Sequence, residues 1–416
     1  MEVYDIIHGS IQICPLAKKI IDTFEFQRLR NIKQLGCCNY VFPSSTHTRF
    51  EHSIGVYHLA RKYVDILNKN GQYFTERDKD CISIAGLIHD IGHGPYSHLF
   101  DELFPEKQNH EYRSGELLKI INKKYNLNFT DDEIKLIIDY IYPKNIEINE
   151  SIKYKYQIIS NNNGIDVDRF DYLARDIHMT GLNFGIEYKR IMENSKIING
   201  QILYSEKVKG NIEEFFHVRF NMYKDVYNHR TVRGIEFMIK DYLQIHKVNE
   251  FISNGSIDGD ECFDLFLAMD DNIIYRSNGE RPFTSPREEC PDSKANMIIN
   301  RINTRDIYKS VGEIIVPNTF EIEKLETDKI IIDVVNINYH SKEKCNYYSE
   351  RKIIDKWKSN QLNNNIKIIT IYYKKPDYKI IAKHIFDDTL TNINNKLEIT
   401  NSYSSGSCSS SSSDRS

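Results

Sequence analysis

Apolar positions from residue 20 to about residue 250 recur mostly at helical spacing, as in the runs at 59–67 and 117–121. Gly and Pro clusters interrupt these runs and mark helix ends. Thr130 and Glu133 form a capping-box pattern directly before the apolar run that starts at Ile134, which predicts a helix start there. We therefore expect a helical domain in this part of the chain.

The pattern changes in the last hundred residues. The segments 329–337 and 366–373 are β-branched runs of strand length, and an amphipathic segment follows at 378–390. We expect a mainly α fold, with a helical core at residues 1–319 and a small C-terminal α+β lobe at residues 320–400. Residues 401–416 are rich in Ser and have too few apolar groups to offset the entropy cost of ordering, which predicts a disordered tail.

The composition indicates a soluble, globular, intracellular protein. The 416 residues are 40% hydrophobic and 27% charged, and the net charge of -4 implies no general attraction to nucleic acid. The eight cysteines contain no Cys-x-x-Cys pair, which favours free thiols in a reducing compartment, the cytoplasm or the nucleus. The N-terminus lacks a signal-peptide pattern, and no apolar run reaches the roughly 18 residues of a membrane span.

The dipeptide His89-Asp90 at the end of an apolar run is the first candidate for chemistry. An ionised group removed from water must be paired or bound to a cation, and a divalent metal would meet that need. Further ligands could come from His52 upstream and Asp168 downstream, both among apolar neighbours. This mixture of imidazole and carboxylate suits Zn, Fe, Mn or Mg. The alternative is that each residue is a hydrogen-bonded polar group of the core.

The spacing from His47 to Glu51 and His52 is one residue too long for a zinc-protease motif, so we set that interpretation aside. A second group of candidates follows the His-Asp pair: His93, His98, Asp101 and His110. The Gly- and Pro-rich segment after Asp90 turns the chain and can return these histidines toward a metal. Imidazole can donate a proton to a leaving alkoxide or hydrogen-bond to phosphoryl oxygens. The alternative to this catalytic role is that these histidines are ordinary surface residues in a turn.

Asp168 and Tyr172 are four residues apart, so one face of a helix can present both to the same pocket. Arg49, Arg169 and Arg219 are candidates for phosphate binding, because the guanidinium fork matches phosphoryl oxygens. Taken singly, an Arg is more often a solvated surface charge.

The order of the four candidate ligands resembles the HD superfamily of metal phosphohydrolases. The wider match is with the deoxynucleoside triphosphate (dNTP) triphosphohydrolases. It is strongest with those members that join a sterile-alpha-motif domain to an HD domain. We expect this chain to lack the sterile-alpha-motif domain. The resemblance covers most of the chain, in the segments Asp5–Gly9, Phe26–Gly36, Tyr40–Pro43, Arg49–Gly55, His89–His98, Asn163–Tyr172 and Val311–Glu313. It implies that residues 1–319 are an HD-domain catalytic core.

The resemblance further implies hydrolysis of a dNTP at the α-phosphorus to a deoxynucleoside and inorganic triphosphate, with Zn, Fe or Mn at the HD site and Mg on the phosphates. By residue match, the metal ligands would be His52, His89, Asp90 and Asp168. The resemblance also implies that His98, oriented by Asp101, donates a proton. It further implies that His93 and His110 contact the phosphates. The triphosphate would bind Arg49, Arg169 and Arg219.

The resemblance also implies how the sugar would be recognised. Its 3′-hydroxyl would be bound by Gln34, Tyr172 and Asp176, whereas Leu35 and Tyr227 would exclude ribose by crowding the 2′ position.

Members of this family are activated by nucleotides that assemble them into tetramers, so the resemblance implies a GTP or dNTP activator and a homo-oligomer, dimer or tetramer. Residues that match the activator site are Asp22, Gln27, Arg30, Arg305 and Lys309. Met1, Tyr4 and Ser205 depart from the family at other activator contacts, so we expect regulation to be simplified or lost.

Two alternatives stay open. One is a phosphodiesterase or nuclease of the HD type on another nucleotide, against which Leu35, Tyr172, Asp176 and Tyr227 argue. The other is a nucleotide-binding sensor without turnover, against which the complete ligand set argues.

Overall fold

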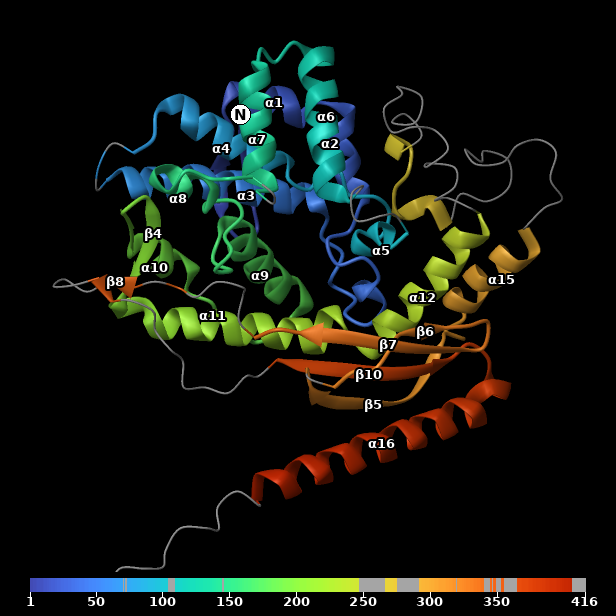
Figure 1. The fold of residues 1–416 in the computed structure, drawn as a ribbon. Coiled ribbons are helices and arrows are strands. Elements are labelled where there is room, and N and C mark those ends of the chain that lie inside the picture. Colours follow the sequence, from blue (N-terminus) through green and yellow to red (C-terminus); the bar gives the residue numbers. More distant parts are fainter. Residues whose placement is uncertain are drawn as a thin grey trace, which may run out of the picture. The chain divides into compact units, whose positions relative to one another are not determined.

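The computed structural model describes residues 1–69, 71, 73–103, 109–143, 146–246, 266–274, 292–318, 320–339, 345, 347–348, 353–354 and 365–405. Contacts between Cα atoms divide the chain into two compact units. One consists of residues 1–304 and 338–364, and the other of residues 305–337 and 365–416. The predicted fold class is confirmed, because the first unit is mainly helical and the second combines strands with a helix (Figure 1).

The described helices of the first unit are α1 (Pro15–Ile21), α2 (Phe24–Gln27), α3 (Arg49–Asn68), α4 (Glu76–Ile88), α5 (His98–Asp101), α6 (His110–Tyr125), α7 (Asp131–Ile141), α8 (Lys153–Tyr156), α9 (Val167–Thr180), α10 (Tyr188–Glu193), α11 (Lys209–Met222), α12 (Arg230–Ile245) and α15 (Asp292–Asn303). α3 is buried along most of its length and packs against α4 and α9. The predicted capping box is confirmed, since Thr130 caps α7 and Glu133 reaches back to it.

Two small sheets were not predicted in the helical unit. β1 (Glu2–Asp5) and β2 (Gly9–Gln12) form an antiparallel hairpin. β3 (Ser195–Ile198) and β4 (Gln201–Ser205) form a second hairpin, which β8 (Tyr347–Tyr348) and β9 (Ile353–Ile354) extend in the order β3-β4-β8-β9. Asn199 and Gly200 connect β3 to β4 with φ angles of 50° and 75°, as a tight two-residue hairpin turn requires.

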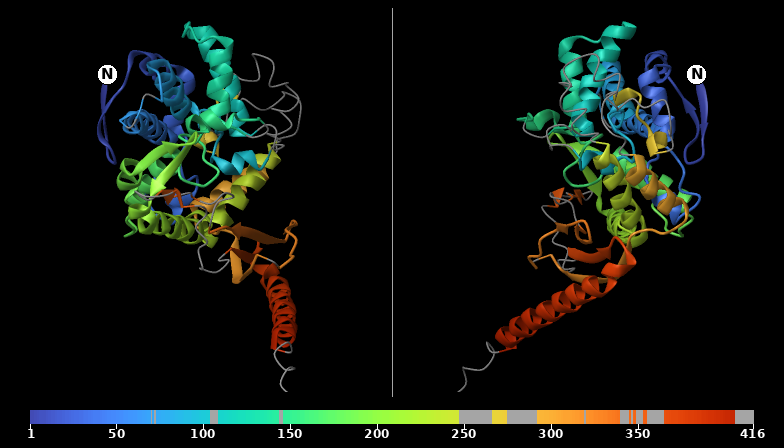
Figure 2. Two further views of the ribbon diagram at one scale, coloured as in Figure 1. Left: turned by 60° about the vertical axis from the view of Figure 1, so that its left-hand side comes forward. Right: turned by 90° about the vertical axis from the view of Figure 1, so that its right-hand side faces the viewer.

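The second unit is a four-stranded antiparallel sheet with one long helix. The strands are β5 (Lys309–Pro317), β6 (Leu325–Glu326), β7 (Ile330–Ile337) and β10 (Ile366–Tyr373), in the order β5-β10-β7-β6. α16 (Lys379–Ser405) covers one face of this sheet (Figure 2), where Ile393 packs with Ile314, Val316 and Ile369 in a small core.

The strands predicted at 329–337 and 366–373 are therefore confirmed, and the amphipathic segment that follows them belongs mostly to α16. The single predicted boundary at 319/320 differs from the observed division. β5 lies before that boundary but is hydrogen-bonded to β10, and residues 338–364 return to the first unit. Within the predicted tail, α16 continues to Ser405, and residues 406–416 lie outside the described residues.

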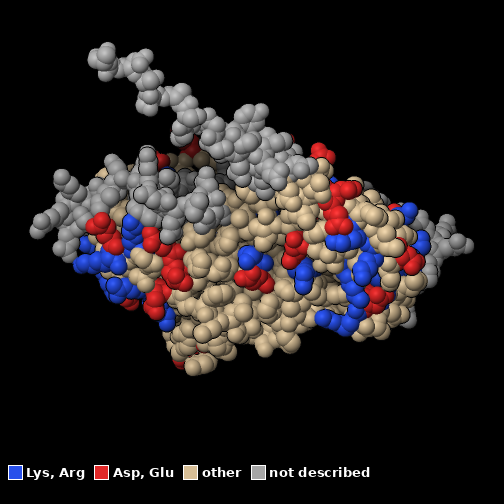
Figure 3. Space-filling view, turned by 90° about the horizontal axis from the view of Figure 1, so that it is seen from below, with Lys and Arg blue, Asp and Glu red and all other residues tan. Residues whose placement is uncertain are grey.

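Charged side chains of both signs are interspersed on the face seen in Figure 3, without a stripe of one sign. This mixture agrees with a net charge of only -4. None of the helices within the described ranges combines the length and the apolar character needed to cross a bilayer.

Candidate metal centre

Three segments of the first unit bring the four predicted ligands together. His52 lies in the first turn of α3, His89 and Asp90 directly follow α4, and Asp168 lies in the first turn of α9. Because α3 packs against both other helices, the four side chains converge. The first three are buried, whereas the side chain of Asp168 is 32% exposed and opens the cluster to one side.

The donor atoms of these side chains are spaced like the ligands of one metal ion. His52 Nε2 lies 3.1 Å from Asp168 Oδ1 and 3.2 Å from His89 Nε2. The two carboxylate oxygens of Asp90 lie 3.5 Å from these imidazole nitrogens, one from each. Tetrahedral ligands at metal distances of about 2.1 Å would lie about 3.4 Å apart. The donor atoms of His52, His89 and Asp168 all lie within 4.8 Å of one another and suit a single cation, and Asp90 adjoins this group.

The hydrogen bonds behind the imidazoles explain why a cation fits. His89 Nδ1 lies 2.8 Å from the backbone oxygen of Gly86, which can only accept, so this nitrogen carries the proton. His52 Nδ1 likewise donates to Asp171 Oδ2 at 2.8 Å. In the neutral imidazoles, both Nε2 lone pairs then face each other and Asp168. Such an arrangement is repulsive unless a cation lies between them, so the donor set fits a divalent metal.

The electrostatics of His52 indicate the same need for positive charge. Burial lowers the pKa of its imidazole, but hydrogen bonds to Asp168 and Asp171 outweigh burial and raise the pKa to about 10. The surroundings of this nitrogen therefore favour a bound cation, whether a proton or a metal.

Asp171 connects the candidate ligand to the N-terminal hairpin. Besides His52, its carboxylate accepts from His8 Nε2 at 2.6 Å and from two nitrogens of Arg175 at 2.9 Å. Arg175 Nη1 in turn donates to Asp5 Oδ2 at 2.8 Å. These residues are buried or nearly so. No positioning role for them was predicted from the sequence.

The second group of predicted residues forms a stack of imidazoles beside the ligands. The rings of His93 and His110 lie parallel, 3.8 Å apart, and the ring of His98 meets His93 edge-on at 5.1 Å. His93 Nε2 lies 3.2 Å from Asp90 Oδ1, which joins the stack to the ligand cluster. Burial and the nearby Arg49 lower the pKa of His98 to about 4, so its imidazole is neutral at pH 7.

Asp101 does not make the contact predicted for it. Instead of orienting His98, its carboxylate lies 2.5 Å from His110 Nδ1 and pairs with Arg113. Asp101 ends the short helix α5 and faces the start of α6, where His110 lies. Asp101 therefore orients His110, whose ring lies 5.5 Å from that of His98.

Two adjoining cavities extend from the cluster. The first, of about 370 Å³, is lined by all four candidate ligands, by His98 and His110, and by the three predicted arginines. We call it the metal-side cavity. The second, of about 300 Å³, is the nucleoside-side cavity, and its walls include the predicted residues Gln34, Leu35, Tyr172, Asp176 and Tyr227. His93 and Asp101 line neither cavity.

The three arginines already have partners in the metal-side cavity. Arg49 pairs with Asp90 and donates from Nε to Ser97 Oγ at 2.8 Å. Arg169 pairs with Asp166, and the guanidinium of Arg219 donates to the backbone oxygen of Asn338 at 3.3 Å. Because each guanidinium has five N–H donors, these contacts leave donors for an anion.

Asp176 in the nucleoside-side cavity is fixed from two sides. Tyr227 donates from its hydroxyl to Asp176 Oδ2 at 2.6 Å, and His47 Nε2 lies 2.8 Å from Oδ1. His47 is buried, and the sequence suggested no role for it once the protease motif was set aside. The only indication in the sequence was that it lies two residues before Arg49, a predicted site residue.

The predicted activator residues fall into two groups. Arg30 Nε donates to Gln27 Oε1 at 2.8 Å, Gln27 donates to the backbone oxygen of Ile21 at 2.7 Å, and Asp22 pairs with Lys18. The other two residues, Arg305 and Lys309, belong to the second unit.

Residues 49–176 match the family model described as HD domain. A Dictyostelium discoideum protein named deoxynucleoside triphosphate triphosphohydrolase SAMHD1 homolog is 37% identical over 84% of this chain and 70% of its own length. A putative HD domain-containing protein, L394, of Acanthamoeba polyphaga mimivirus is 41% identical over 74% of this chain and 72% of its own. The mouse deoxynucleoside triphosphate triphosphohydrolase SAMHD1 is 32% identical over 91% of this chain and 69% of its own length.

Proposed function

The chain belongs to the family of SAMHD1 deoxynucleoside triphosphate triphosphohydrolases with an HD domain, and we propose that it hydrolyses dNTPs to a deoxynucleoside and inorganic triphosphate. The observation that carries this proposal is the convergence of two imidazoles and two carboxylates in the wall of a cavity that shares residues with a second one. A candidate metal centre thus adjoins a second cavity, and Arg49 lines both.

The HD site would hold Zn, Fe or Mn, and Mg would accompany the phosphates. A divalent metal held by His52, His89, Asp90 and Asp168 would lower the pKa of a water molecule and polarise the phosphoryl oxygen. Water would add to the α-phosphorus, and the bond from that phosphorus to the 5′-oxygen would break. Triphosphate would then leave on one side and the deoxynucleoside on the other.

The arginines would hold the triphosphate. Arg49, Arg169 and Arg219 line the metal-side cavity and carry donors beyond those used within the protein. Guanidinium groups spread positive charge over several phosphoryl oxygens and stabilise the charge that develops during bond cleavage. His93 would act near the phosphates through the histidine stack rather than from the cavity wall.

A proton must reach the leaving 5′-oxygen, and His98 is our candidate donor. Its imidazole lines both cavities, which supports a role at the linkage between phosphate and sugar. A bound triphosphate adds negative charge beside the ring and favours its protonated form. We further propose that Asp101 supports this step indirectly, since it orients His110, which in turn lies beside His98.

The nucleoside-side cavity would select the sugar. Gln34, Tyr172 and Asp176 would hydrogen-bond to the 3′-hydroxyl, and Leu35 and Tyr227 would crowd the 2′ position. The contacts of Asp176 with His47 and Tyr227 support this role, because they orient its carboxylate, which can accept a further hydrogen bond from a sugar hydroxyl.

Product analysis by phosphorus NMR tests the reaction. Metal-loaded protein incubated with each dNTP should release inorganic triphosphate, and an Asp90→Ala variant should release none. Pyrophosphate with a nucleoside monophosphate as the products would contradict the proposal and favour a phosphodiesterase or nuclease. Binding of dNTPs without any product would favour a sensor.

We also propose that GTP or a dNTP activates the chain by assembling a dimer or tetramer, through Asp22, Gln27, Arg30, Arg305 and Lys309. The clustering of Gln27 and Arg30 supports a polar site at the surface of the first unit. Light scattering with and without GTP would test this. A mass that does not change with GTP, together with unchanged turnover, would contradict it.

A further inference from the structure

Five residues line both cavities: Gln34, Arg49, His98, Tyr172 and Tyr223. The sequence assigned a role to each of them except Tyr223. A residue that belongs to both walls lies at the passage between the metal end and the nucleoside end. If the proposed function holds, this passage is where the α-phosphate joins the sugar. Tyr223 is therefore placed to touch a substrate at its central linkage.

The backbone at Tyr223 has an uncommon geometry. α11 ends at Met222 and continues as a wider π-helical turn over Tyr223–Tyr227. The backbone oxygen of Tyr223 accepts from the backbone nitrogen of Asn228, five residues on, at 3.1 Å, and from its side chain at 2.7 Å. Single π-helical turns of this kind occur frequently at functional sites. This turn determines how side chains on the helix face the passage.

The ring of Tyr223 is the middle member of a stack that follows the passage. On the metal side, the guanidinium carbon of Arg219 lies 4.7 Å from the ring centroid. On the nucleoside side, the ring of Tyr227 meets it edge-on at 5.1 Å and 81°. The same Tyr227 donates its hydroxyl to Asp176. One aromatic ring thus contacts both a predicted phosphate ligand and a predicted sugar-selecting residue.

Arg219 depends on these rings for its position. Its Nε atom is buried without a hydrogen-bond partner among the residues that the structure describes, and its bond to Asn338 is long at 3.3 Å. Tyr172 lines the metal-side cavity together with Arg219. A guanidinium over an aromatic face is held by the quadrupole of the ring and keeps its N–H donors at the edge. Tyr223 therefore supports the guanidinium of Arg219 in the wall of the metal-side cavity.

We propose that Tyr223 is a positioning and specificity-determining residue, which holds Arg219 for the triphosphate and Tyr227 for the sugar and so couples recognition of the two. This inference rests on the proposed function of the site. It assigns the coupling to the aromatic ring rather than to the hydroxyl, because both contacts are made by the ring.

The test compares Tyr223→Phe, Tyr223→Leu and Tyr223→Ala with the wild-type chain, for each dNTP and its ribonucleotide. Leu and Ala should raise KM for dNTPs about tenfold, as expected for loss of a partly buried cation–π contact. They should also reduce the preference for dNTPs over ribonucleotides, because Tyr227 loses its support. Phe should keep both properties within about threefold of wild type.

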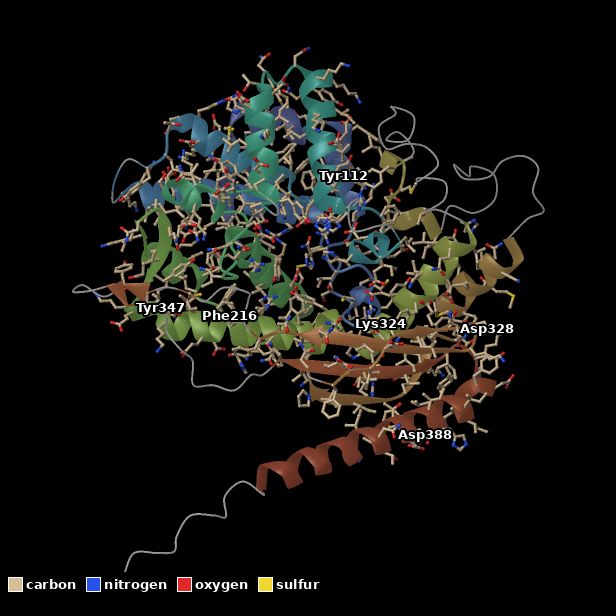
Figure 4. All side chains as sticks on the ribbon, in the orientation of Figure 1. Tyr112, Phe216, Lys324, Asp328, Tyr347 and Asp388 are labelled. Carbon is tan, nitrogen blue, oxygen red and sulfur yellow. The ribbon has the colours of Figure 1, made fainter. Side chains whose placement is uncertain are left out.

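A matched control is Tyr112→Ala, which removes an exposed tyrosine from α6 (Figure 4). It should alter neither KM nor the sugar preference. Thermal unfolding identifies any variant that fails to fold, and Leu retains enough volume to fill the site if Ala does not. Titration calorimetry with a non-hydrolysable dNTP analogue measures binding without turnover.

Two kinds of failure are distinguishable. Wild-type protein that releases no triphosphate from any dNTP would refute the proposed function. Wild-type protein that does so, with folded Leu and Ala variants whose KM and sugar preference match it, would overturn the role of Tyr223. A loss in the Phe variant equal to that in Leu would also overturn it, because the hydroxyl would then be responsible.

Discussion

The Nδ1 atom of His52 on α3 lies 2.8 Å from the Oδ2 atom of Asp171 on α9. This bond fixes the imidazole so that its other nitrogen faces the candidate ligands. We predict that Asp171→Asn lowers metal affinity by about 10- to 100-fold, the usual effect of losing a hydrogen-bond partner behind a ligand. Metal content after dialysis, measured by plasma mass spectrometry, checks this. Asp65→Asn, at an exposed position on α3, should leave metal content unchanged.

The network around Asp171 explains a glycine in α3. A Cβ atom at Gly55 would lie 1.9 Å from Asp171 Oδ1 and 2.6 Å from Arg175 Nη2. Since this ion pair is buried and cannot move aside, Gly55→Ala should destabilise the fold by about 1–3 kcal/mol. Chemical denaturation measures the change. Gly210→Ala, where nothing lies within 4 Å of the added carbon, should be neutral or slightly stabilising, and equal losses in both variants would contradict the explanation.

His47 offers a test at the nucleoside end. Replacement by Ala removes one of the two groups that orient Asp176, at a cost of about 1–3 kcal/mol for a buried partner left unsatisfied. We expect kcat/KM for dNTPs to fall about tenfold or more, while metal content stays at the wild-type level. A loss of metal together with activity would instead place His47 in the support of the metal centre.

The sequence was most informative where short motifs carry the chemistry. The four candidate ligands come from three segments, and the structure brings their donor atoms within 3.5 Å of a neighbour in the cluster. Their assignment as ligands stays a prediction until a metal is measured. Residue types that demand a cation when buried could be recognised without knowledge of the fold.

The residues that hydrogen-bond to the candidate site residues and orient them could not be recognised from the sequence. His8 and Asp171 are 163 positions apart in the chain, and only the packing of the N-terminal hairpin brings them together. His47 is an ordinary buried histidine until its partner Asp176, 129 positions on, is known. Contacts of this kind depend on tertiary structure, which periodicity does not encode.

Two of the strand regions that were not predicted were missed for different reasons. Asn199-Gly200 is a strong hairpin signal, but the helical spacing on either side of it outweighed the turn. β5 was assigned to the core because it precedes the change in composition, although its pairing partner β10 lies about fifty residues further on. Strand pairing over that distance is decided by the sheet and not by the local pattern.

Metal removal gives a test that does not depend on turnover. The Nε2 atoms of His52 and His89 lie 3.2 Å apart beside the carboxylate of Asp168, so a metal ion that binds these groups only in the folded chain should stabilise it. Adding Mn²⁺ or Zn²⁺ to chelator-treated protein should raise Tm with increasing metal concentration, as the free energy of unfolding grows by about 2.7 kcal/mol at a hundred times Kd. His89→Ala should abolish this dependence, because it removes one of the candidate ligands. His217→Ala, at an exposed position on α11, should keep it. A Tm that responds to metal equally in both variants would mean that the stabilising ion binds elsewhere.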